Sequence, residues 1–214
     1  MTILQINKHY YPRDGTSVAM LNLSKLLEKH GHSIVPFSMT QPENLPTPYD
    51  HSFVSQVWAE KVRFDWQGLR TAFRALYSFE AKRKIAKLIR LAKPDLAHVH
   101  NIYNQISPSI FAPLRRAKIP VVMSVHDWAL ISPNYNLFDH HEICERGLGH
   151  QWKIVKHRCV KDSLVASFWA ALVFSFHHWF RFYERGVKKY IVPSQFVKDK
   201  LIAAGLPVEK IVLI

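Results

Sequence analysis

The fold is decided by two apolar runs near the middle of the chain, "DLAHVH" (residues 95–100) and "IPVVMSV" (residues 119–125). Each run is short and largely apolar, which predicts a β-strand that is buried on both faces. Four further runs of this kind occur at residues 2–7, 33–39, 189–193 and 210–214. Buried strands therefore recur from one end of the chain to the other.

Helical patterns separate most of these runs. Residues 17–30 have apolar side chains at helical spacing, with Ser17 as the expected cap and Gly31 placed for a left-handed turn after the helix. Residues 69–93 and 194–205 repeat the pattern. Strands and helices in alternation, with strands this apolar, predict an α/β fold: a doubly wound, Rossmann-like parallel sheet with helices on both faces.

The composition is that of one globular domain spanning residues 1–214. Apolar residues make up 48% and charged residues 21%, which is close to ordinary globular usage. The 29 Lys and Arg residues against 16 Asp and Glu residues give a net charge of +13, which favours anionic partners. Two cysteines are too few for a disulfide framework, and residues 1–11 lack the basic-then-apolar pattern of a leader, so we do not expect secretion. We expect a cytoplasmic protein.

Two regions lack a clear period, residues 40–53 and 126–162, and we expect both to be long loops at one end of the sheet. The second region holds four side chains of the types that bind zinc: Cys144, His150, His157 and Cys159. Their spacing matches no paired-ligand pattern. We therefore expect no metal.

Polar residues end or follow two of the predicted strands. His100 and Asn101 stand at the end of one strand, and His126 and Asp127 stand directly after another. Ligands of open parallel sheets bind beyond the carboxyl ends of the strands, so we expect these four residues to converge on the rim of one crevice. A lone histidine is more often structural, so the prediction rests on the pairing.

The first strand leads into the loop "KHYYPRDGTS" (residues 8–17). Gly15 before a helix places backbone N–H groups and the positive end of the helix dipole where an anion can bind. The loop lacks the three spaced glycines of a dinucleotide fingerprint and the Gly-Lys pair of a P-loop. It fits either a plain strand-to-helix turn or an anion-binding loop.

The segment "SLVASFWAALVFSFHHWFRFYERGVKK" (residues 163–189) is apolar almost all round before it turns basic. Its apolar run is too short for a membrane span. Two interpretations stay open: a buried or half-buried helix, or a helix in a membrane interface with its basic end among anionic lipids. The basic run at residues 80–90 is typical of a solvated helix face. Without a recognisable module, no nucleic-acid partner is expected.

In order along the chain, these segments resemble the N-terminal half of the GT-B glycosyltransferases of family 4. Residues 10–34, "YYPRDGTSVAMLNLSKLLEKHGHSI", are similar to the glycine loop and first helix of that family. "KPDLAHVHN" (93–101) and "IPVVMSVHDW" (119–128) resemble its strands before the cleft, and "IVPSQFVKDKLIAAGLPVEKIVLI" (191–214) resembles its approach to the interdomain linker. The resemblance implies an acceptor-binding domain, one half of a GT-B architecture, with the C-terminal donor-binding domain absent.

The resemblance also implies the chemistry. Family members transfer a sugar from a nucleotide-sugar donor to a hydroxyl, with retention of anomeric configuration and without a metal or other cofactor. The basic surface suits a polysaccharide or lipid-linked acceptor in cell-envelope assembly, with the enzyme peripheral on the inner face of the membrane. Alone, these residues are expected to be inactive. The alternative is a free-standing basic module that binds an anionic membrane or polymer without catalysis.

The resemblance assigns roles to three pairs of residues. The pairs are His126 and Asp127 at the catalytic centre, Gly15 and Thr16 in the loop for the donor phosphate or acceptor, and His100 and Asn101 on the acceptor side. His126 would face the donor sugar. Relatives commonly carry two adjacent glycines where this chain has Gly15 and Thr16.

Overall fold

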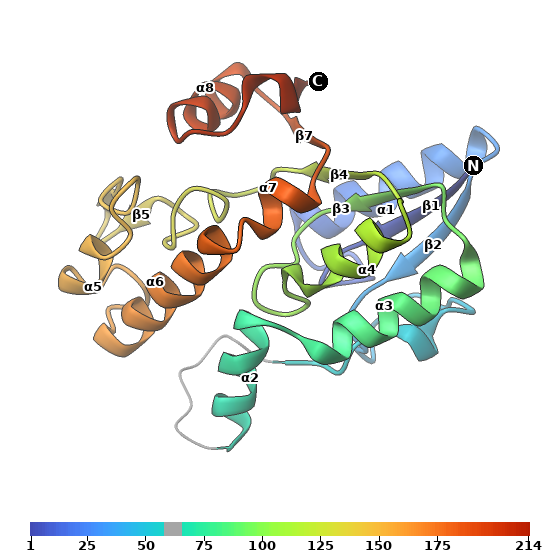
Figure 1. The fold of residues 1–214 in the computed structure, drawn as a ribbon, viewed down its shortest axis with the longest axis horizontal. Helices are drawn as coiled ribbons and strands as arrows, with labels where there is room; N and C mark the ends of the chain where they lie inside the picture. The colour runs from blue at the N-terminus through green and yellow to red at the C-terminus, as the bar shows by residue number, and fades with distance from the viewer. Residues whose placement is uncertain (58–65) are drawn as a thin grey trace. The chain divides into compact units, whose positions relative to one another are not determined.

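The computed structural model describes residues 1–57 and 66–214, which form two compact units. Unit 1 consists of residues 1–124 and 186–190, and unit 2 consists of residues 125–185 and 191–214. Figure 1 shows the elements in chain order, from blue at the N-terminus to red at the C-terminus. The expectation of a single domain over residues 1–214 stays a prediction.

Unit 1 contains the first four strands. They are β1 (Thr2–Ile6), β2 (Ser33–Phe37), β3 (Leu96–Val99) and β4 (Val121–Ser124). Its α-helices are α1 (Gly15–Lys29), α2 (Trp66–Leu76), α3 (Phe79–Ala92) and α4 (Phe111–Arg116). Its 3-10 helices are η1 (Asp50–Ser52) and η2 (Pro108–Ile110). The strands predicted in this part of the chain are confirmed.

The sheet has six strands in the order β2-β1-β3-β4-β7-β8, where β7 is Lys189–Val192 and β8 is Ile211–Leu213. β1 pairs in parallel with β2 and β3, and β3 pairs in parallel with β4. In the core, Leu4 lies opposite Val35 on one side and Ala97 on the other, and all three are buried. Figure 1 shows α1 behind these strands and α4 in front of them. The doubly wound α/β fold is confirmed.

Helix α1 begins two residues earlier than predicted, because Asp14 and not Ser17 caps it. Asp14 Oδ1 accepts a hydrogen bond from the Ser17 N–H at 2.8 Å, and Ser17 Oγ accepts one from the Asp14 N–H at 2.9 Å. This reciprocal pair is a capping box in which serine takes the place of the usual Glu or Gln. After the helix, Gly31 has a φ of 79°, the left-handed conformation that the sequence predicted.

The single helix predicted over residues 69–93 is wrong, because α2 and α3 are separate helices with a break at Ser78. The Ser78 hydroxyl caps α3 by accepting a hydrogen bond from the Ala81 N–H at 3.1 Å. The Ser78 N–H donates to Ser107 Oγ at 2.9 Å. Since these bonds replace the ones that a continuous helix would make, the chain turns at this serine.

Unit 2 contains the antiparallel hairpin β5 (Phe138–Asp139) and β6 (Glu142–Ile143). Its helices are α5 (Lys153–Lys156), α6 (Leu164–Trp179), α8 (Gln195–Ala203) and η3 (Val208–Lys210), and α7 (Phe182–Gly186) lies in it except for Gly186. The strands and the helix predicted after residue 188 are confirmed. The expectation of an unbroken loop over residues 126–162 is wrong, since the hairpin and α5 form there.

Helix α6 presents apolar side chains to solvent as well as to the interior. Ala171 and Val173 are buried, whereas Leu164 and Trp179 are 54% and 84% exposed. A half-buried helix therefore describes the segment, and contact of its open face with lipid stays a prediction. In residues 1–57 and 66–214, no helix combines the length and the apolar character that a membrane crossing needs.

Candidate functional site

One asparagine joins the carboxyl ends of β1 and β3. Asn7 Oδ1 accepts a hydrogen bond from the Asn101 N–H at 3.2 Å, and Asn7 Nδ2 donates to the His9 carbonyl at 3.0 Å. The Lys8 N–H donates to the Asn101 carbonyl at 3.0 Å. These bonds place the half-buried Asn101 beside the start of the β1–α1 loop, at the sheet edge where ligands of this fold class bind.

His100, directly after β3, is buried and only 2% exposed. Its Nε2 lies 3.1 Å from Gln5 Oε1, and its ring centroid lies 4.3 Å from that of His98. His98 Nε2 in turn lies 2.8 Å from Ser124 Oγ. The histidines form a buried polar layer under the strand ends, and Asn101 is the more accessible member of the predicted acceptor pair.

Gly15 and Thr16 form the first turn of α1, where backbone N–H groups have no acceptor within the helix. A Cβ added at Gly15 would meet no atom of the described residues within 4 Å, so packing does not require glycine there. The Asp14 carboxylate shares this turn, and Lys8 Nζ lies 3.7 Å from it. Burial acts to raise the pKa of Asp14, but hydrogen bonds from Ser17 and the charge of Lys8 hold it below its usual value.

His126 and Asp127 lie in unit 2, directly after Val125. His126 is exposed, and Asp127 is half-buried. Asp127 Oδ1 accepts a hydrogen bond from the Ala129 N–H at 3.0 Å, a local turn that aspartate commonly makes. His100 and Asn101 belong to unit 1. The convergence of all four residues on one rim therefore stays a prediction.

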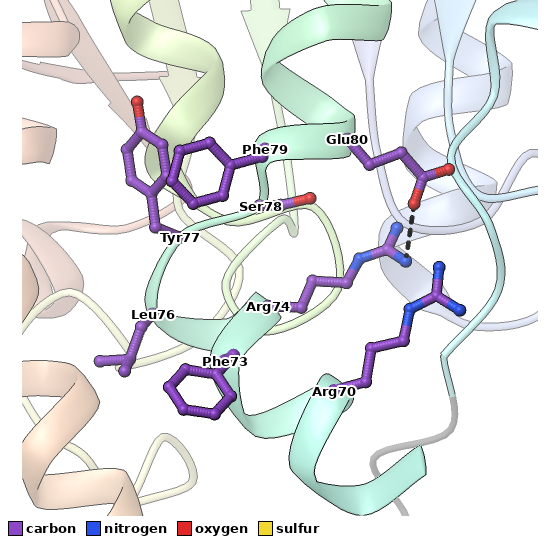
Figure 2. A pocket seen from close by; sticks show the side chains of 8 residues that line it. All are labelled: Arg70, Phe73, Arg74, Leu76, Tyr77, Ser78, Phe79 and Glu80. Atoms are coloured by element: carbon purple, nitrogen blue, oxygen red, sulfur yellow. Dashed lines mark ion pairs between the residues drawn. The ribbon is translucent and has the colours of Figure 1, made fainter. Parts of the chain in front are cut away.

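A pocket of about 410 Å³ lies at the elbow between α2 and α3, and the sequence analysis missed it. Figure 2 shows the guanidinium groups of Arg70 and Arg74 on one side, beside Glu80, and the rings of Tyr77 and Phe79 together on the other. The lining residues are Arg70, Phe73, Arg74, Leu76, Tyr77, Ser78, Phe79 and Glu80. One wall is therefore cationic and the opposite wall aromatic.

Arg74 is the buried cation of this pocket, with 6% of the residue exposed. Its Nε donates to the Gln105 carbonyl at 2.8 Å, and its Nη1 donates to Ser55 Oγ at 2.8 Å. Its Nη2 is buried and has no hydrogen-bond partner among the residues that the structure describes. Burial lowers the pKa of Arg74, but an arginine stays charged at neutral pH. The unsatisfied Nη2 therefore favours an anionic or polar ligand.

Glu80 balances the charge of Arg74. Glu80 Oε2 lies 3.2 Å from Arg74 Nη1, and the carboxylate also accepts hydrogen bonds from the N–H and hydroxyl of Ser55 at 2.7 and 2.6 Å. Burial acts to raise the pKa of Glu80, but the Ser55 hydrogen bonds and the Arg74 charge outweigh it and hold this pKa below its usual value. Glu80 is thus ionised at neutral pH and orients the guanidinium.

The fold and the polar strand ends define a Rossmann-like α/β protein of the class that binds ligands beyond the carboxyl edge of a parallel sheet. The sequence matches the family described as Glycosyltransferase Family 4 over residues 13–214. The chain therefore belongs to glycosyltransferase family 4, and the resemblance seen in the sequence is confirmed.

Solved structures with a similar fold share little sequence with the chain. The UDP-N-acetylglucosamine 2-epimerase of Rickettsia bellii is 12% identical with a TM-score of 0.49, and the match covers 100% of this chain and 44% of the epimerase. MurG of Acinetobacter baumannii is 10% identical with a TM-score of 0.47, and the match covers 100% of this chain and 44% of MurG. A transferase of Siraitia grosvenorii, solved with UDP, is 12% identical with a TM-score of 0.46, and the match covers 100% of this chain and 50% of the transferase. The chain spans half of these proteins or less. A search of curated proteins gave no match.

Proposed function

We propose that the chain is the acceptor-binding half of a retaining glycosyltransferase that works in the cytoplasm, at the inner face of the membrane. Membership of glycosyltransferase family 4 is the observation that supports sugar transfer as the reaction. The donor is a nucleotide-sugar held mainly by a second domain, and the acceptor is a cell-envelope polysaccharide or a lipid-linked glycan. We expect negligible transfer from the 214 residues alone.

In the proposed reaction, the bond between the anomeric carbon and the diphosphate oxygen breaks. The acceptor oxygen bonds to the anomeric carbon on the same face of the sugar, its proton leaves, and the nucleoside diphosphate departs. Negative charge grows on the diphosphate, and the N–H groups of Gly15 and Thr16 would stabilise part of it. His126 would face the donor sugar beside Asp127. The proposal uses no metal at this centre.

The α2–α3 pocket supports an anionic lipid-linked acceptor. Arg70 and Arg74 offer charged donors of the kind that bind phosphate, while the 69% exposed Phe79 offers an apolar surface for a lipid chain. Arg74 also contacts Gln105, which belongs to the segment between β3 and η2. The pocket therefore borders the same connection that begins near Asn101.

Vesicle binding tests the acceptor. Three vesicle preparations are compared: phosphatidylcholine alone, phosphatidylcholine with a long-chain isoprenyl phosphate, and phosphatidylcholine with phosphatidylserine of equal total charge. The chain should prefer the isoprenyl phosphate. Arg70→Ala and Phe79→Ala should each weaken that binding roughly fivefold, on the order of 1 kcal/mol for a partly exposed contact. Arg83→Ala, which removes an exposed arginine of α3 outside the pocket, should leave it nearly unchanged.

Equal binding to both anionic vesicles, falling steeply with salt, would contradict the acceptor pocket and favour a basic module without catalysis. Sugar transfer needs a separate assay, in which release of nucleoside diphosphate is followed for a panel of nucleotide-sugars. Efficient turnover by the 214 residues alone would refute the half-enzyme proposal. In a complete enzyme, His126→Ala should lower turnover without moving the urea midpoint of unfolding.

A further inference from the structure

Three metal-binding side chains, which are spread over residues 139–159, meet inside unit 2. Asp139, Cys144 and Cys159 each offer one ligand atom, and these atoms all lie within 4.8 Å of one another. The two sulfurs are 3.7 Å apart. Both cysteines are buried, at 1% and 4% exposure, and the Asp139 side chain is 10% exposed. The cluster is thus shielded from solvent and mixes two thiols with a carboxylate.

Local structure explains how the three residues meet. Asp139 ends β5, and Cys144 follows β6 of the same hairpin, where its N–H donates to the Leu137 carbonyl at 2.8 Å. Cys159 follows α5, and its N–H donates to the Ile154 carbonyl at 3.0 Å. Ile154 packs in one apolar cluster with both cysteines. The hairpin and the α5 segment therefore bring the two sulfurs together.

The sulfur separation fits a tetrahedral zinc ion. Two sulfurs that are each about 2.3 Å from zinc, at a tetrahedral angle, stand about 3.8 Å apart. A disulfide would need about 2.05 Å, and both cysteines are free thiols here. Two uncharged thiols in simple contact also lie near this distance. Asp139 adds a carboxylate that accepts a hydrogen bond from Cys159 and is also of a type that binds zinc, and metal titration separates the two cases.

The charges around the cluster also fit a divalent cation. Two cysteines that lose their protons to a bound metal, together with the Asp139 carboxylate, would carry three negative charges, of which a zinc ion balances two. Arg146 Nη1 lies 3.6 Å from Cys144 Sγ, and Arg146 Nη2 also pairs with Glu142 Oε1 at 2.6 Å. His140 Nδ1 lies 2.8 Å from Asp139 Oδ2, which places an imidazole beside the carboxylate.

We propose that Asp139, Cys144 and Cys159 bind one zinc ion, with a water molecule as the fourth ligand, and that this ion joins the β5–β6 hairpin to the α5 segment. Three protein ligands with a water differ from the four protein ligands that close most structural zinc sites, and the proposed ion is independent of the proposed transfer reaction. It replaces the ligand set considered from the sequence, since His150 and His157 are exposed and lie outside the cluster. Sulfur-rich sites of this kind select zinc over magnesium or calcium.

Cobalt substitution tests the site on the full chain. Reduced, metal-free protein is titrated with Co²⁺ and followed by its sulfur-to-cobalt charge-transfer absorption, and zinc content is measured on protein purified with reductant. We expect one ion per chain. Asp139→Asn and Cys144→Ser should each weaken cobalt binding at least about tenfold, the scale seen when even outer partners of a metal are lost. His157→Ala is the matched control and should bind normally.

Asp139→Asn keeps the shape of the side chain, so it tests the ligand even if Cys144→Ser does not fold. Absence of a charge-transfer band in the reduced wild-type chain would overturn the proposal. So would a stable Cys144–Cys159 disulfide in protein purified without oxidant, or a loss in His157→Ala equal to that in Asp139→Asn.

Discussion

Replacing Glu80 with glutamine should destabilise unit 1, because it removes the negative charge that faces the buried guanidinium of Arg74. The two side chains are 3.2 Å apart, with 5% of Arg74 and 23% of Glu80 exposed. Glutamine keeps one carbonyl oxygen for the Ser55 N–H, so that hydrogen bond survives. The ion pair does not, and Arg74 is left with neutral partners only.

The size of the effect follows from the burial of the pair. Removing one partner of a fully buried ion pair costs about 3–5 kcal/mol, whereas exposed pairs contribute about 0–1 kcal/mol. Since solvent reaches Glu80 and screens the pair in part, we expect a loss of about 2–3 kcal/mol for Glu80→Gln. For a protein of this size, that lowers the melting temperature by roughly 5–10 °C.

Urea unfolding across pH measures this effect and its cause. The folded pKa of Glu80 lies below the unfolded value of about 4.3, so its stabilisation is fully present above that pH and is lost as pH falls through the folded pKa. Glutamine does not titrate. The difference between wild type and Glu80→Gln should therefore be constant from about pH 5 to 8 and shrink below about pH 4.3.

Glu43→Gln is the control, because Glu43 is an exposed carboxylate in the loop at residues 40–53. It should change the free energy of unfolding by less than about 0.5 kcal/mol. If Glu80→Gln is equally mild, or if its effect keeps its full size at pH 3.5, the buried ion pair is not what stabilises the elbow.

Three further substitutions test other parts of unit 1. Asp14→Ala should cost about 1 kcal/mol in urea unfolding through loss of the α1 cap, and an unchanged midpoint would argue against the capping box. Gly15→Ala should leave the free energy of unfolding unchanged or raise it by up to about 1 kcal/mol, because the new Cβ meets no described atom. Sugar transfer by a complete enzyme should fall. Unaltered transfer would show that Gly15 only forms the strand-to-helix turn. Gly186→Ala should cost about 1–3 kcal/mol, because its Cβ would stand 2.5 Å from Phe111 Cγ, and a neutral result would mean that this ring moves freely.

The strands were predictable from the sequence because a buried strand requires a short run of apolar residues. An apolar run of four to seven residues, such as residues 119–125, has few alternatives when helical patterns lie on both sides. Helix limits were less predictable, because Asp14 and Ser17 are both good caps and only their mutual hydrogen bonds select one. The break at Ser78 depends on Ser107, which is 29 residues away.

The predicted site residues were placed on the right elements, but their contacts could not be predicted. The sequence placed His100 at a strand end, whereas its burial against Gln5 depends on tertiary packing. The stretch at residues 70–80 shows arginines interleaved with aromatic residues, which is the signal that could have pointed to the α2–α3 pocket. The pocket itself exists because the chain turns between the two helices.

The order of hydrophobic and polar residues determined the fold class of this protein, because strand burial and helix periodicity act over a few neighbouring positions. The family followed from the resemblance of particular segments, such as residues 119–128, and from the family match. Tertiary structure alone decided the capping partner of α1, the elbow that holds Arg74 against Glu80, and the meeting of Asp139 with two cysteines. Those features depend on side-chain contacts that a hydrophobic pattern does not record, such as the hydrogen bond from Ser78 to Ser107 across 29 residues, and these contacts are set only when the apolar surfaces pack together.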